Sequence, residues 1–131
     1  QAYLINKLES LQNKSARFIT KNYSRTSSIT EIKMSLNLPS LQSRRLLSLL
    51  SLFHKIYHNG SHLSVLIKPA HRISARLDHE FKLEPFFART NLYLYSPLVL
   101  AVNHWNQLPE DIVCITNHDE FTRKLKLHLG V

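Results

Sequence analysis

The sequence predicts a mainly α-helical protein, a helical bundle with a small β element in its second half. Apolar residues recur at helical spacing through the first half of the chain, and helix-capping residues stand at the expected intervals. The 131 residues are 44% hydrophobic, which is enough for a packed core in one domain or two small lobes. We expect lobes at residues 1–60 and 61–131.

Residues 2–21 form the clearest predicted helix. Leu4, Leu8, Leu11 and Phe18 follow one another at helical spacing and give one apolar stripe. We expect this apolar stripe to face the core.

Two further helices are predicted before residue 60. Ser28 and Glu31 have the spacing of a capping box, which starts a helix over about 29–36. Ser40 caps a third helix that runs to about Tyr57. Because this third helix is apolar on more than one side, we expect it to be central to the bundle.

The second half changes character. Aromatic and β-branched residues within 72–95 predict two or three short strands, although a proline interrupts them. A proline at the first helical position predicts a helix over 97–107. Asn117 or Asp119 caps a last helix through about Leu129.

Positive charge is concentrated in the first half. Residues 1–60 hold nine Lys and Arg against two acidic residues, whereas residues 61–131 hold eight against seven. A folded basic face is typical of proteins that bind a phosphate backbone, and a solvated surface is the plainer alternative. The candidate nucleic-acid-binding residues are Lys7, Lys14, Arg17 and Lys21, which the helical angle groups on one side of the helix over 2–21, together with Arg44 and Arg45.

The composition excludes several classes of site. Two glycines are too few for a dinucleotide-binding fingerprint or a P-loop. A single cysteine, Cys114, excludes an intrachain disulfide and a multi-cysteine zinc site. We expect no signal peptide, no membrane partner and no membrane-spanning segment. The chain opens with Gln1 instead of Met, so we expect it to be part of a longer polypeptide.

Three sets of residues resemble catalytic or metal-binding groups. The strings at 78–80 and 118–120 each join a histidine with two acidic residues, but capping and solvated roles are far commoner for such strings. His54 and His58 share a helix face without a third ligand nearby, so no metal site is expected. Cys114 is more simply a small buried apolar residue than a nucleophile.

The most distinctive string is Trp-Asn-Gln-Leu-Pro, which supplies Trp105, Asn106, Leu108 and Pro109. The indole buries a large ring, the asparagine can end a helix and the proline prevents its continuation. A structural corner is therefore favoured over a binding surface.

Three strings, in order, resemble the C-terminal region of LINE-type (non-LTR) retrotransposon reverse transcriptases, especially arthropod transposon copies. Each of them matches a landmark of that family. They are Leu8-Glu9-Ser10-Leu11-Gln12-Asn13-Lys14-Ser15-Ala16-Arg17-Phe18, Leu36-Asn37-Leu38-Pro39-Ser40-Leu41-Gln42-Ser43-Arg44-Arg45, and Arg89-Thr90 with Ser96-Pro97, Trp105-Asn106-Gln107-Leu108-Pro109 and the final Phe121 and Leu125.

The resemblance implies a thumb-like basic lobe over residues 1–60 and a C-terminal α+β extension over residues 61–131. It implies a non-catalytic fragment without cofactors, since the palm domain with its Asp-Asp motif is missing and no Asp-Asp pair occurs here. Its partners would be RNA or an RNA/DNA duplex and the palm of the parent polypeptide, which is expected to act in the nucleus. Two departures are Ser15, where the family has Ala, and Leu98, where it has Arg after the proline.

Two alternatives stay open. The chain is a protein-interaction module whose cationic face docks an acidic partner, or it is an inactive transposon remnant.

Overall fold

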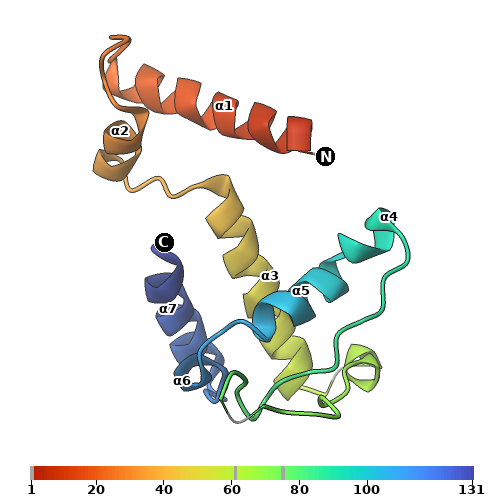
Figure 1. The fold of residues 1–131 in the computed structure, drawn as a ribbon. Coiled ribbons are helices and arrows are strands. Elements are labelled where there is room, and N and C mark those ends of the chain that lie inside the picture. The colour runs from red at the N-terminus through yellow and green to blue at the C-terminus, as the bar shows by residue number, and fades with distance from the viewer. Residues whose placement is uncertain (1, 61, 75) are drawn as a thin grey trace. The chain divides into compact units, whose positions relative to one another are not determined.

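The computed structural model describes residues 2–60, 62–74 and 76–131, and in these ranges the chain is mainly helical (Figure 1). This confirms the predicted fold class. Residues 1, 61 and 75, which fall inside the predicted lobes and β element, lie outside the described residues. The elements are α1 (Ala2–Thr20), α2 (Ile29–Ser35), α3 (Leu41–His58), the 3-10 helix η1 (His62–Leu66), α4 (Asn91–Leu94), α5 (Pro97–Trp105), α6 (Glu110–Val113) and α7 (His118–Leu129).

The chain divides into two compact units. The first unit contains residues 1–45 and 130–131, and the second contains residues 46–129. The division falls within α3, earlier than the expected boundary near residue 60. The reason is that α3 from Leu46 onward contributes side chains to the core of the second unit.

In the first unit, α1 packs on α2 (Figure 1). Ala16 of α1 is 0% exposed, and Ile32 of α2 is also buried. The apolar stripe of α1 (Leu4, Leu8, Leu11 and Phe18) is between 46% and 73% exposed, so the prediction that it faces the core is wrong.

Polar contacts also hold α1 in place. The Gln12 side-chain amide donates to the carbonyl of Pro39 at 3.0 Å. The Glu9 carboxylate accepts from the backbone N–H of Gln42 at 3.2 Å and lies 3.6 Å from the Lys33 ammonium. These contacts tie α1 to α2 and to the first turn of α3.

The helix starts use the predicted residues in different ways. The Ser40 hydroxyl accepts from the N–H of Ser43 at 3.0 Å, and Asn117 accepts from the first turn of α7 at 3.0 and 3.1 Å. Ser28 stands at the N-cap of α2 with an extended backbone, but its hydroxyl makes no capping hydrogen bond. The predicted capping box is therefore incomplete.

The second unit has an aromatic core between α3, α5 and α7. Phe53, Trp105 and Phe121 are at most 2% exposed. The rings of Phe53 and Trp105 meet edge to face at 5.3 Å, an arrangement that aromatic pairs favour. The central place expected for the third helix therefore holds for its part within the second unit.

The predicted β element is wrong. Among the described residues, the β pairing in this region is one isolated antiparallel bridge between Pro69 and Leu83. Two hydrogen bonds of 2.9 Å flank it, and Pro69 has no N–H to extend the ladder. Residues 92–95 are predicted as a strand, but Asn91–Leu94 form α4, at whose start the Thr90 hydroxyl accepts from the N–H of Tyr93 at 3.3 Å.

The predicted corner at Trp105 and Asn106 holds this irregular segment. The Trp105 indole N–H donates to the carbonyl of Phe81 at 3.1 Å. The Asn106 amide accepts from the N–H of Leu83 and donates to the carbonyl of the same residue, both at 2.8 Å. Leu83 is 2% exposed, so its backbone N–H and carbonyl are buried and need hydrogen-bond partners. Asn106 provides both partners, as a neighbouring strand would.

We expect Asn106→Ala to lower the free energy of unfolding by about 2–4 kcal/mol, because two buried backbone groups of Leu83 lose their partners. Urea denaturation followed by circular dichroism measures this. Gln107→Ala removes an exposed neighbouring amide and should change stability by less than about 0.5 kcal/mol. Equal stability of the two variants would contradict this role of Asn106.

Candidate nucleic-acid interface

All six predicted nucleic-acid-binding residues lie in the first unit. Residues 1–45 hold eight Lys and Arg against Glu9 and Glu31, a net charge of +6. The second unit holds nine against seven, a net charge of +2. The positive charge is therefore concentrated in the smaller unit.

Lys7 and Lys14 lie two turns apart on one side of α1, and both are exposed. The Lys7 ammonium lies 5.8 Å from the centre of the Tyr3 ring. No acidic group of a described residue lies within salt-bridge distance of either lysine. Both ammonium groups can therefore meet an anion from solvent.

Arg17 has a structural role in this unit. Its guanidinium donates to the backbone carbonyls of Ser24 at 2.9 Å, Ser27 at 3.1 Å and Asn22 at 3.4 Å. These bonds hold the turn between α1 and α2. The Arg17 guanidinium thus uses several of its N–H donors for hydrogen bonds inside the protein.

Lys21 does not continue the helix on which its prediction rested. Helix α1 ends at Thr20, and Lys21 has a φ of 53°, in the left-handed region. Its side chain is exposed, but the helical angle that grouped it with Lys7 and Lys14 does not apply to it.

Arg44 and Arg45 are exposed in the first turns of α3. Cations at this end of a helix face an unfavourable macrodipole. The structure supplies a compensating charge, since the Glu9 carboxylate bonds the N–H of Gln42 at the same helix end. The position of the two arginines therefore needs no bound anion for its stability.

Two cationic pairs thus remain available in the first unit, one on α1 and one at the start of α3. Sequence reasoning did not assign Arg25, which is exposed in the turn that Arg17 holds. Its only sequence signal was its place in a polar turn between two helices.

The string at residues 78–80 is structural. The Asp78 carboxylate accepts from the N–H of Ser74 at 2.8 Å and pairs with the Lys82 ammonium at 2.6 Å. The Lys82 ammonium, followed by the Ser74 N–H, lowers the pKa of Asp78. His79 is 5% exposed and bonds the carbonyl of Trp105 at 3.1 Å.

Cys114 is exposed, which contradicts the expected buried role. Within the described ranges, no group of three or more His, Cys, Asp and Glu side chains is arranged to hold a metal ion.

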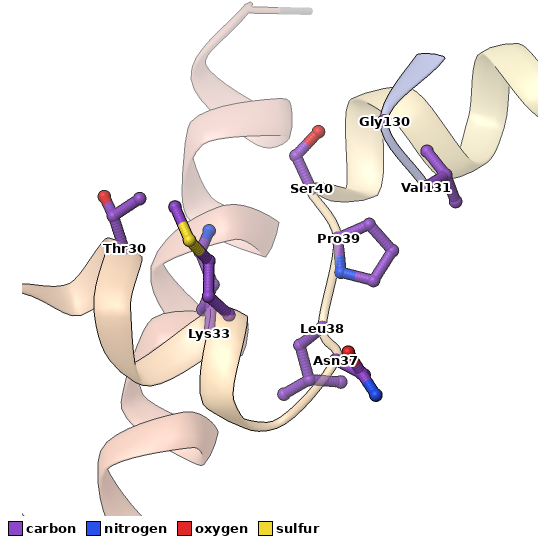
Figure 2. A pocket seen from close by; sticks show the side chains of 9 residues that line it. Thr30, Lys33, Asn37, Leu38, Pro39, Ser40, Gly130 and Val131 are labelled. Atoms are coloured by element: carbon purple, nitrogen blue, oxygen red, sulfur yellow. The ribbon is translucent and has the colours of Figure 1, made fainter. Parts of the chain in front are cut away.

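A hollow of about 610 Å³ lies in the first unit beside α2 (Figure 2). Its one charged side chain, Lys33, pairs with Glu9. The residues that line the hollow therefore suit binding of a ligand better than catalysis. It is lined by Thr30, Lys33, Met34, Asn37, Leu38, Pro39, Ser40, Gly130 and Val131.

Among the described helices, none has the length and apolar character needed to cross a bilayer. Comparison of the chain with protein-family models, curated proteins and solved structures finds no match.

We expect Arg17→Gln to raise the exchange rates of the Ser24 and Ser27 amides about three- to tenfold, because the turn loses bonds worth about 1 kcal/mol. Hydrogen exchange followed by nuclear magnetic resonance measures this. Arg25→Gln removes the same charge from the same turn and should leave these rates within about twofold. Similar rates in the two variants would show that charge alone matters.

Proposed function

We propose that this chain is the thumb and C-terminal extension of a LINE-type retrotransposon reverse transcriptase. In this role it is a non-catalytic part of the polymerase that binds the template–primer duplex through its phosphates. The observation that carries the proposal is the concentration of exposed, unpaired cations in the first unit.

The charge supports phosphate binding because of where it lies. Lys7 and Lys14 project from α1, and Arg44 and Arg45 project from the start of α3. Phosphate oxygens accept hydrogen bonds from both residue types, and arginine binds them with two parallel bonds. Lysine and arginine together therefore suit a backbone that carries one charge per nucleotide.

The family landmarks support the proposal through their place in the first unit. Three residues of the first landmark make contacts beyond α1: Glu9 bonds α3, Gln12 bonds the carbonyl of Pro39 and Arg17 holds the turn. Ala16 of the same landmark is buried, and Pro39 belongs to the second landmark. Part of the residues that carry the resemblance thus also hold this unit together.

Binding of this kind follows duplex shape and charge. Side chains cannot reach the base edges in the deep, narrow major groove of an A-form duplex, so contacts go to phosphates and sugars. The affinity should therefore depend weakly on sequence and strongly on salt.

The alternative, a module that docks an acidic protein, draws on the same cations. The exposed apolar stripe of α1 beside Lys7 and Lys14 favours it specifically, since protein partners cover apolar surface and phosphates do not. Equal, salt-dependent affinity for heparin and for an RNA/DNA duplex would favour this alternative.

We expect the variant Lys7→Gln, Lys14→Gln, Arg44→Gln, Arg45→Gln to weaken duplex binding and to reduce its dependence on salt. Each lost phosphate contact lowers the slope of log affinity against log salt by about 0.7 to 0.9, so four contacts lower it by roughly three. Titration of an RNA/DNA duplex at several salt concentrations measures the slope.

A matched control removes four exposed cations from the second unit, with the changes Lys55→Gln, Arg72→Gln, Arg123→Gln and Lys126→Gln. Its net charge equals that of the test variant, and its slope should change by less than one. Equal slopes for both variants would mean that total charge, and no particular surface, governs binding. Circular dichroism establishes that both remain folded.

We also expect the isolated chain to show no primer extension in the presence of Mg²⁺. Nucleotide transfer needs clustered carboxylates that hold two metal ions, and the chain contains no Asp-Asp pair. The assay uses a primed RNA template and labelled nucleotides. Incorporation above a no-protein control would refute the assignment as a non-catalytic part.

A further inference from the structure

Three histidines gather in the core of the second unit, and the proposed function does not use them. His54 and His58 lie on α3 and His118 lies at the start of α7. The rings of His54 and His58 are 4.4 Å apart, and those of His54 and His118 are 5.4 Å apart. We call these three residues the histidine cluster.

A chain of hydrogen bonds fixes where the protons of the histidine cluster lie. His54 Nε2 lies 2.7 Å from the carbonyl of Ile115, which can only accept, so this nitrogen carries the proton. His54 Nδ1 is then bare and accepts from His118 Nδ1 at 3.4 Å. His118 Nε2 is bare in turn and accepts from the Ser51 hydroxyl at 3.2 Å.

A further proton on His54 cannot be taken up without rearranging these hydrogen bonds. A proton on His54 Nδ1 would face the N–H of His118, so His118 would have to move its proton to Nε2 and the Ser51 hydroxyl would have to turn to accept it. The Ser51 hydroxyl could then donate to Thr122, 3.3 Å away. His54 is the fully buried member of the histidine cluster.

The surroundings of His54 also disfavour a charge. It is 1% exposed and its ring stacks on Phe121 at 4.1 Å. From α5 it meets the ring of Trp105 at 6.4 Å, and the Tyr57 ring lies 4.9 Å from His58. The nearby titratable groups are His58 and His118, and no carboxylate of a described residue lies within salt-bridge distance of the three rings.

We propose that the histidine cluster is a proton-binding site that loosens the second unit under mildly acidic conditions by separating α7 from α3. The group taken up is one proton on His54. Its uptake forces the hydrogen bonds between His54, His118 and Ser51 to rearrange, and it places a charge on a buried ring that no carboxylate of a described residue neutralises. That charge also repels a proton on His58 or His118, whose rings lie 4.4 and 5.4 Å away, and this repulsion weakens the packing of α7 on α3.

The direction of the effect follows from linkage. Burial lowers the pKa of His54 below its ordinary value of 6.5, and the charges of His58 and His118 lower it further, against the raising effect of the Ile115 carbonyl. Burial also lowers the pKa of His58. The unfolded chain therefore binds protons that the folded chain does not bind, and the free energy of unfolding falls as pH falls through about 6.5.

The test is urea denaturation at pH 7.5 and pH 5.5, followed through the fluorescence of Trp105, the one tryptophan of the chain. A histidine that stays neutral in the folded state raises the unfolding equilibrium constant roughly tenfold between these values. We expect a rise of at least this size in the unmodified protein. An equilibrium constant that is unchanged between pH 7.5 and pH 5.5 would overturn the proposal.

His54→Gln keeps one donor for Ile115 and one acceptor for His118 but cannot titrate. Between pH 7.5 and pH 5.5 we expect the unfolding equilibrium constant of His54→Gln to rise about tenfold less than that of the unmodified protein. His71→Gln changes an exposed histidine, and its equilibrium constant should rise as much as that of the unmodified protein. An equally large rise in folded His54→Gln would overturn the proposal.

A measurement on the unmodified protein covers the case in which His54→Gln fails to fold at pH 7.5. Nuclear magnetic resonance of the imidazole Cε1 protons follows each histidine as pH falls. A His54 signal that stays neutral until α7 loosens supports the proposal. Titration of His54 at or above its ordinary pKa in the folded protein overturns it.

Discussion

The pairing of the Asn106 amide with the backbone of Leu83 is the contact on which the second unit depends. Among its described residues, the segment between η1 and α4 has almost no regular structure, yet Leu83 within it is buried and its backbone N–H and C=O need partners. Such groups must find partners. Asn106 supplies both, and Trp105 beside it places its ring in the aromatic core while bonding Phe81. A single turn at the end of α5 therefore joins the irregular segment to the helices.

The helical elements could be predicted because periodicity and capping act locally. The starts of α3 and α7 follow from Ser40 and Asn117, whose side chains bond the first turns. The buried face of α1 could not be predicted in this way. A regular apolar stripe indicates a helix but does not say what covers it, and here Ala16 is buried and the amide of Gln12 bonds Pro39 while the stripe stays exposed. The expected strand near residue 93 failed for a related reason, since one hydroxyl at Thr90 was enough to start a helical turn.

In the candidate interface, too, features of single residues could be predicted, whereas contacts between separate parts of the chain could not. The sequence alone indicated the positive charge of the first unit and identified Lys7, Lys14, Arg44 and Arg45 as candidates. The bonding of Arg17 was not, because its three carbonyl partners lie in a turn whose path the sequence does not specify. The histidine cluster could not be predicted either, because His54 and His118 lie far apart in the sequence and meet only through packing of α7 on α3.

The exposed apolar stripe of α1 has a consequence for how copies of the chain behave in solution. Exposed apolar stripes of two copies associate in water, and Lys7 and Lys14 beside each stripe oppose this association by like-charge repulsion. That repulsion reaches about 10 Å at 0.1 M salt and about 3 Å at 1 M, while the attraction between apolar surfaces does not weaken. Colloidal stability therefore falls as ionic strength rises, and concentrated solutions of the protein keep best in dilute buffer.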